Sequence, residues 1–252
     1  MSIWLEATIL LSVGVITGFI NVLAGGGSLL TLPTLIFLGL PGAVANGTNR
    51  VALLMQSLVT MVGFRRHKVF PVKTSVMAAV PALIGAWIGA WVAVDLSDEL
   101  FKPVLGVVML FVLAIILFDP AKRIKAIDAE KPLLRRIVLF IGFFIVGLYG
   151  GFIQAGVGFL IISILLMAGL DLVKINAVKN IVVGIFTFLA MAIFVVNGQV
   201  HWLYGFLLGV GNAIGGWAGT HVAVKKGHHW IRRFVIAAVL VFSGKLIFDS
   251  FL

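Results

Sequence analysis

The chain consists of long apolar runs separated by short polar stretches. Apolar residues follow one another without the period-two alternation of a membrane β-strand, so helices are expected throughout. Several runs approach the ~20 residues that a helix needs to cross a bilayer. The pattern therefore predicts an all-α polytopic membrane protein. The predicted helical segments are 4–23, 28–40, 44–63, 74–94, 103–118, 136–154, 157–170, 175–196, 202–223 and 234–250.

Two polar interruptions break this pattern in the first part of the chain. The first, Ala24–Ser28, contains three successive glycines, and each costs a helix about 1 kcal/mol relative to alanine. The second is Ala45–Arg50. Within a bilayer, irregular backbone is tolerated only where it faces protein or a water-filled cavity. Segments 28–40 and 157–170 are too short to cross straight, so they are expected to be half-helices or re-entrant pieces.

The two halves of the chain match each other at a shift of 130 residues. Ile84–Gly89 (IGAWIG) corresponds to Ile214–Gly219 (IGGWAG), and their small-xxx-small spacing favours close helix packing. A further match, Gly18–Ile20 with Gly151–Ile153, needs a slip of three residues. The matches indicate an internal duplication, as in many transporters. The expected units are a first transmembrane repeat (1–120), a cytoplasmic linker (121–134) and a second transmembrane repeat (135–252).

Loop charges predict how the two copies lie in the membrane. Loops 64–73, 119–136 and 224–233 are cationic and are expected in the cytoplasm, whereas the acidic loop 95–102 and the uncharged loop 197–201 are expected outside. Loops 64–73 and 197–201 are repeat partners, so equivalent loops fall on opposite sides. Two inverted repeats of about five helical segments each are therefore predicted, with both termini outside. The alternative is four plus four crossings, with the short segments as re-entrant loops.

Composition agrees with a membrane protein and excludes several other classes. Apolar residues make up 62% of the chain and charged residues 11%, against roughly 25% charged residues in a soluble domain. The net charge of +10 follows from the cytoplasmic loops, so nucleic acid is not an expected partner. The absence of cysteine excludes disulfides, thiolate metal sites and thiol catalysis. No basic stretch precedes the first apolar run, so no cleaved signal peptide is expected.

The second polar interruption carries the candidate chemistry. Thr48 or Asn49 is expected to cap a helix that begins near Val51, with Arg50 in its first turn. A cation there opposes the helix macrodipole, and an anion held between the backbone amides and the guanidinium would remove that conflict. In the second copy, Lys179 lies beside the matching position. The alternative is that both cations extend to lipid phosphates.

Polar residues around the two interruptions form the candidate substrate site. The glycine break is interpreted as a discontinuous helix whose free amides face an anion, although a tight bend or close helix packing also requires glycine. Taken alone, each uncharged polar residue is better explained by an interhelical hydrogen bond than by a ligand contact, so their clustering is the signal. The predicted substrate-binding residues are Gly25, Gly26, Gly27, Ser28, Asn46, Thr48, Asn49, Arg50, Gln154, Lys179 and Asn180.

The distribution of acidic residues limits the chemistry. All nine fall at segment ends or in loops, so an acid-based proton relay or a carboxylate sodium site is not expected. The sequence also contains no P-loop pattern and no His/Glu metal constellation. We therefore expect no catalytic residues, no metal and no cofactor. Cations near the candidate site, without acidic residues beside them, favour an anionic substrate.

Four motifs resemble those of the sulfite exporter TauE/SafE-like permease family. They are Gly25–Pro33 (GGGSLLTLP), Gly39–Pro41 (GLP), Ala45–Asn49 (ANGTN) and Gly85–Gly89 (GAWIG). The resemblance spans essentially the whole chain and implies an inner-membrane permease for small sulfur-containing anions such as sulfite, sulfoacetate and related organosulfonates. The second copy lacks the triple glycine, which points to one site built mainly by the first repeat.

We expect a multi-pass protein of the inner (plasma) membrane that exports a sulfur oxyanion or organosulfonate. Export needs no coupling ion, because moving one negative charge out of a cell at −100 mV gains about 2.3 kcal/mol. One alternative is an importer of another small organic or inorganic anion. Another is a non-transport membrane enzyme or assembly subunit, which the lack of a paired acid/base or nucleophile disfavours. The expected partners are the small anion and the lipid bilayer, and the oligomeric state is left open.

Overall fold

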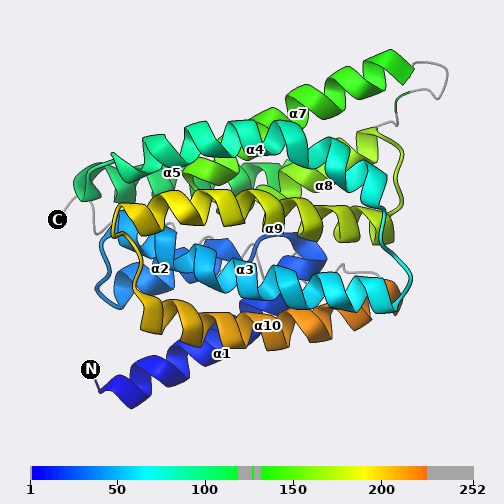
Figure 1. Ribbon diagram of the computed structural model, residues 1–252. Coiled ribbons are helices and arrows are strands. Elements are labelled where there is room, and N and C mark those ends of the chain that lie inside the picture. The colour runs from blue at the N-terminus through cyan, green and yellow to red at the C-terminus, as the bar shows by residue number, and fades with distance from the viewer. Residues whose placement is uncertain (1, 119–126, 128–131, 226–252) are drawn as a thin grey trace.

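The computed structural model describes residues 2–118, 127 and 132–225, and in this part of the chain it contains helices and no strands (Figure 1). Four of these helices, α1, α4, α7 and α9, are long and apolar enough to cross a membrane. The helices are α1 Ile3–Ala24, α2 Ser28–Phe37, α3 Gly42–Arg66, α4 Val72–Val94, α5 Asp98–Phe118, α7 Pro132–Phe152, α8 Val157–Met167, α9 Leu172–Val196 and α10 Trp202–Lys225.

The predicted all-helical class is confirmed. Each predicted segment up to 202–223 corresponds to one helix of the structure. The last predicted segment, 234–250, lies outside the described residues, as do most of the linker 121–134 and of the loop 224–233.

The start of α3 corrects the helix predicted to begin near Val51. α3 begins at Gly42, directly after the extended residue Pro41. Thr48 and Asn49 therefore lie inside the helix and cap nothing, and Arg50 lies more than two turns from its start. Asparagine and glycine have low helix propensity, but tertiary packing overrides that preference here because residues 45–53 are all buried. Residues 45–50, predicted as a polar interruption, instead form part of the buried face of one long helix.

α3 and α9 form the centre of the bundle, where they pack against each other (Figure 1). α10 packs along α1 and also contacts α3. On the other side, α4 packs along α7 and also contacts α9. Each outer pair therefore joins one helix from the first half of the chain to one from the second half.

Glycines let the helices of the outer pairs approach closely. A Cβ added at Gly215 of α10 would lie 1.9 Å from the carbonyl oxygen of Val15 on α1. A Cβ added at Gly85 of α4 would lie 2.1 Å from the carbonyl oxygen of Phe144 on α7. No side chain fits at such distances, so the packing role predicted from the small-xxx-small motifs is confirmed.

The predicted match of Gly18–Ile20 with Gly151–Ile153 is wrong. Gly18 lies against Asn212, and Gly147 lies against Ala82, which is 130 residues before Asn212. Gly18 therefore corresponds to Gly147. In apolar, glycine-rich helices, a short identical tripeptide recurs without marking equivalent positions.

The two ends of the bundle can be named from contacts. At one end, which we call the Glu6 end, the Tyr204 hydroxyl donates to the Glu6 carboxylate and joins the starts of α10 and α1. At the other, which we call the His67 end, the rings of His67 and His221 lie 5.0 Å apart at the ends of α3 and α10. α3 runs from the Glu6 end to the His67 end. α9 runs the opposite way, since its start lines a surface hollow with the loop between α3 and α4 (Figure 1).

The short helices α2 and α8 are the return arms of two hairpins. α1 starts at the Glu6 end, and α2 leads back there because α3 starts there. α7 follows its partner α4 away from the His67 end, and α8 returns to that end, where α9 begins. α2 has 10 residues and α8 has 11, so neither crosses the bundle. The tips of both hairpins lie inside the protein.

The outer surface and the interior have the polarity expected of a protein surrounded by lipid. Large apolar side chains are exposed on the outer helices, including Trp87 and Trp217. In contrast, Arg50 and Asn49 have no exposed surface at all. Polar residues within a membrane typically face the bundle interior and mark functional sites.

Candidate functional site

The tips of the two hairpins meet in the centre of the protein. α1 is followed by Gly25 with φ of 79°, and α8 is preceded by Gly156 with φ of 69°, a left-handed conformation that favours glycine. The Gly158 N–H donates to the Gly25 carbonyl oxygen at 3.2 Å. A Cβ added at Gly158 would lie 2.2 Å from the Gly25 Cα. The glycine break is therefore both a helix discontinuity and a point of close backbone contact.

Arg50 binds the end of α7 from the interior of α3. Its guanidinium donates to the carbonyl oxygens of Gly150, at 3.1 Å, and Gly151, and more weakly to Asn46 Oδ1 at 3.5 Å. The guanidinium carbon also lies 4.7 Å from the centre of the Phe194 ring. Helix C-termini carry unpaired carbonyls and a partial negative charge, which a cation stabilises.

Lys179, in the interior of α9, binds the end of α1 in the same way that Arg50 binds the end of α7. Its ammonium donates to the carbonyl oxygens of Asn21 at 3.0 Å and Val22 at 2.7 Å, and to Asn176 Oδ1 at 2.9 Å. All three N–H donors of the ammonium are therefore used. The two caps are crossed, because a cation from each half of the chain binds the hairpin of the other half.

These contacts correct the chemistry expected of the two cations. Extension to lipid phosphates is excluded because Arg50 is 0% and Lys179 2% exposed. Arg50 also does not lie at a helix N-terminus, since its partners are the C-terminal carbonyls of α7. In the described part of the chain, neither cation forms an ion pair; the pairs found there are Lys102–Asp98 and Lys174–Asp171.

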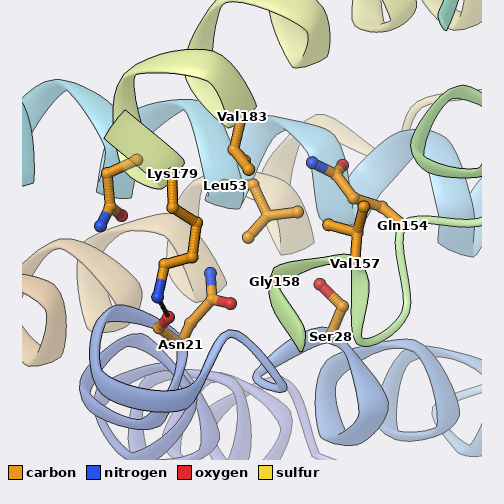
Figure 2. Close-up of a pocket in the computed structure, with 9 residues that line it drawn as sticks. Asn21, Ser28, Leu53, Gln154, Val157, Gly158, Lys179 and Val183 are labelled. Carbon is orange, nitrogen blue, oxygen red and sulfur yellow. Dashed lines mark hydrogen bonds between the residues drawn. The ribbon is translucent and has the colours of Figure 1, made fainter. Parts of the chain in front are cut away.

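A small polar cavity lies between the hairpin tips, and we call it the tip cavity. Leu53 and Val183, which are separated by 130 residues and lie midway along α3 and α9, both line it. Its volume is about 10 Å³, room for about one water molecule. Figure 2 shows eight of its lining residues by name; the full set is Asn21, Ser28, Leu53, Gln154, Val157, Gly158, Lys179, Asn180 and Val183.

Comparison with known sequences identifies the family. Residues 10–246 match the family described as Sulfite exporter TauE/SafE. The chain belongs to this family. The resemblance noted in the motifs is thereby confirmed, and so is the class of membrane transporter.

The relatives of this TauE/SafE chain described below are named as membrane transporters. Each match covers nearly the whole length of both chains. A "Probable membrane transporter protein" of Haemophilus influenzae is 26% identical over 246 residues, which is 96% of this chain and 94% of the relative. The "Probable membrane transporter protein YfcA" of Escherichia coli K12 is 26% identical over 243 residues, 96% of this chain and 90% of the relative. The "Probable membrane transporter protein ORF9" of a Sinorhizobium species is 24% identical over 235 residues, 93% of this chain and 89% of the relative. No solved structure matches the chain.

In this TauE/SafE protein, the predicted site residues fall into two groups. Ser28, Gln154, Lys179 and Asn180 line the tip cavity. The other predicted residues do not line it. Among them, Gly25 contacts the opposite tip, Gly26 and Gly27 lie buried in the turn before α2, Asn46 donates to the Phe152 carbonyl at 2.7 Å, and Arg50 caps α7.

Two further predicted residues support neighbouring elements. Thr48 Oγ1 accepts from the backbone N–H of His201 at 2.9 Å, so Thr48 faces the loop before α10. Asn49 donates to Ser28 Oγ at 3.4 Å and accepts from Thr31 Oγ1 at 2.6 Å. Asn49 therefore ties α3 to the first turn of α2 and holds Ser28 at the tip cavity.

Sequence reasoning missed Asn21 and Gly158 as lining residues. Asn21 donates to Gln56 Oε1 at 3.1 Å, while its backbone oxygen accepts from Lys179. A signal for it exists, because Asn21 is the one amide side chain in the apolar run before the triple glycine. No local pattern singles out Gly158, whose role depends on the tip of the other hairpin.

The described residues contain no group of three or more His, Cys, Asp or Glu side chains that could hold a metal ion. The polar groups that line the tip cavity are the Lys179 ammonium, side-chain amides and the Ser28 hydroxyl. The positive charge of Lys179 suits an anion better than a cation.

Proposed function

We propose that this TauE/SafE protein is a permease for a small sulfur-containing anion, such as sulfite or an organosulfonate, which it exports across the inner (plasma) membrane. The observation that carries the proposal is the pair of fully buried cations beside the hairpin tips, Arg50 and Lys179, without an acidic partner in the described part of the chain.

Electrostatics support an anionic substrate. Burying a charge in a low-dielectric interior carries a penalty of several kcal/mol even after relaxation. Carbonyl oxygens at 2.7–3.1 Å offset part of that penalty for the two cations, but they add no net negative charge. An anion in the tip cavity completes the compensation for Lys179, which lines that cavity. A monoanion also gains about 2.3 kcal/mol on leaving a cell at −100 mV, which favours the outward direction.

Symmetry supports alternating access. We propose that residues 1–120 and 135–252 are inverted repeats joined by a cytoplasmic linker. The opposite directions of α3 and α9, and the hairpins entering from opposite ends, are consistent with such repeats. The cations Arg65, Arg66, Lys68 and Lys73 lie at the His67 end, so that end is the cytoplasmic one. Because the tip cavity holds only about 10 Å³, substrate entry requires the tips to separate.

The test is tracer flux in proteoliposomes at a clamped potential, comparing sulfite, thiosulfate, sulfoacetate, taurine and chloride. Saturable flux of a sulfur anion that scales with potential supports the proposal. Flux of a carboxylate instead supports the importer of another anion. A folded protein that moves none of these solutes but retains a bound partner protein supports an enzyme or assembly subunit.

Two matched lysines on α9 test the buried charge. Lys179→Met removes the cavity cation, and we expect flux to fall at least about tenfold, since one lost charge-assisted interaction is worth about 1.5–3 kcal/mol. Lys174→Met changes a lysine whose side chain is 61% exposed, and flux should stay unchanged. Equal flux in both variants would contradict the role of Lys179.

A further inference from the structure

Gln154 and Thr187 form a buried pair beside the tip cavity. Gln154 lies in the break between α7 and α8, is 1% exposed and lines the cavity (Figure 2). Thr187 lies on α9 and is 0% exposed. Gln154 Nε2 lies 2.6 Å from Thr187 Oγ1, and Gln154 Oε1 has no hydrogen-bond partner among the described residues. A buried polar atom without a partner costs about 1–3 kcal/mol, so a ligand that pairs with the free end of this amide would remove that cost.

The hydrogen bond between the two side chains can form in either orientation of the amide. As the side chains lie, Gln154 Nε2 donates to Thr187 Oγ1. The Thr187 hydroxyl can donate, and a half-turn of the Gln154 amide exchanges its oxygen and nitrogen. With the oxygen toward Thr187, the group left without a partner is the NH₂.

We propose that the Gln154 NH₂ group donates to the bound anion and that Thr187 is the positioning residue that holds it in this orientation. This inference rests on the proposed function, because an anion is the ligand that satisfies an unpaired donor beside a buried cation. It also deepens that function, because the donors come from both hairpins. Ser28 Oγ accepts from Asn49 at 3.4 Å, which leaves the Ser28 hydroxyl hydrogen free to donate. Two separate neutral donors select an oxyanion with several acceptor oxygens over a halide.

The experiment measures KM and maximal rate for sulfite and sulfoacetate in proteoliposomes carrying the full chain. Thr187→Val keeps the shape of the side chain but removes its hydroxyl, so we expect KM to rise about tenfold while the maximal rate changes by less than about twofold. Thr187→Ser should restore the KM of the wild type. In the double variant with Gln154→Leu, Thr187→Val should add nothing further, because the two residues act through one hydrogen bond.

Thr220→Val is the matched control. Thr220 is also 0% exposed, but its hydroxyl donates to the Gly216 carbonyl of its own helix at 2.8 Å. KM should stay at the wild-type value in this variant. Gln154→Glu provides a second measurement that needs no change at Thr187. The carboxylate accepts from Thr187 but offers no donor to an anion, so KM should rise more than tenfold.

The possible failures are distinguishable. An unchanged KM in Thr187→Val or in Gln154→Glu, with wild-type flux intact, overturns the roles of Gln154 and Thr187 and leaves the proposed function standing. Equal rises in Thr187→Val and Thr220→Val indicate a general packing effect and overturn the inference as well. Absence of saturable anion flux by folded wild-type protein overturns the proposed function, and this inference with it.

Discussion

At the scale of the residue, Arg50 and Lys179 have two roles that follow from the same contacts. Each binds carbonyl oxygens at the end of a helix that stops inside the protein, where water cannot replace the missing hydrogen bonds. Each also brings a positive charge to the centre of the bundle. The cations therefore stabilise the broken helices and, on our proposal, attract the substrate.

Replacing the branched guanidinium of Arg50 by a lysine ammonium tests the capping role of Arg50. Arg50→Lys should lower the free energy of unfolding by about 1.5–3 kcal/mol, because an ammonium on a shorter side chain does not reach both Gly150 and Gly151. Thermal unfolding in detergent measures the loss. Arg65→Lys on the same helix is the control, since Arg65 is exposed. Equal midpoints for the two variants would show that the carbonyls of α7 do not depend on Arg50.

At the scale of the element, the two hairpins are defined by where their helices stop. α1 and α7 are long and apolar, yet each ends beside glycines, and each end is capped from the opposite half of the chain. α2 and α8 then lead back to the end from which α1 and α7 started. The breaks are predictable from glycine content, but the direction of the return arms is not, because a glycine permits many backbone paths.

The contact between the tips predicts a steric effect at Gly158. Gly158→Ala should destabilise the protein by about 1–3 kcal/mol, since the new Cβ would lie 2.2 Å from the Gly25 Cα, which belongs to backbone and cannot rotate away. Gly142→Ala is the control, because its Cβ would meet only the Ile164 side chain at 3.0 Å. Thermal unfolding compares the two. If Gly158→Ala loses no more stability than Gly142→Ala, the two hairpin tips do not touch in the folded protein.

The start of α9 predicts a pH-dependent cap. The Asp171 carboxylate accepts from the Lys174 backbone N–H at 3.0 Å, and this bond, followed by the interaction with the Lys174 side chain, lowers the pKa of Asp171. Because the folded pKa lies below the unfolded one, the stabilisation is complete above the unfolded pKa of about 3.9 and is lost as pH falls through the folded pKa.

Asp171→Ala should therefore lower the free energy of unfolding by about 1 kcal/mol at pH 7, and the difference from wild type should shrink below pH about 4. Unfolding midpoints across this pH range measure it. Asp95→Ala is the control, since Asp95 follows the last residue of α4 and caps no helix N-terminus. A difference that stays constant down to the lowest pH would contradict the ionised cap.

At the scale of the whole molecule, pairs of helices from different halves enclose a polar centre within an apolar surface. α1 with α10 and α4 with α7 form the outer walls around α3 and α9 (Figure 1). α3 and α9 run in opposite directions, as the proposed inverted repeats require. On that proposal, the same motion of either half would open the tip cavity to one side or the other.

Single cysteines test the predicted orientation without background, because the chain contains no cysteine. Asn197→Cys, at the end of α9, should react with a membrane-impermeant maleimide in intact cells, whereas Lys73→Cys, at the start of α4, should react only after permeabilisation. Both positions are exposed. Labelling of Lys73→Cys from outside would reverse the orientation derived from loop charge. Labelling of both from one side would contradict the inverted repeats.

The sequence by itself determined the membrane class, the helical segments and the family, because hydropathy and glycine breaks are local and the family motifs are contiguous. It also located four lining residues of the tip cavity: Ser28, Gln154, Lys179 and Asn180. Only the tertiary structure decided what these groups bind. Arg50 meets Gly150 across 100 residues of chain, and Lys179 meets Asn21 across 158. The start of α3, the crossed caps and the Gln154–Thr187 pair depend on such distant contacts, in which burial overrides local propensity and one half of the chain completes the other.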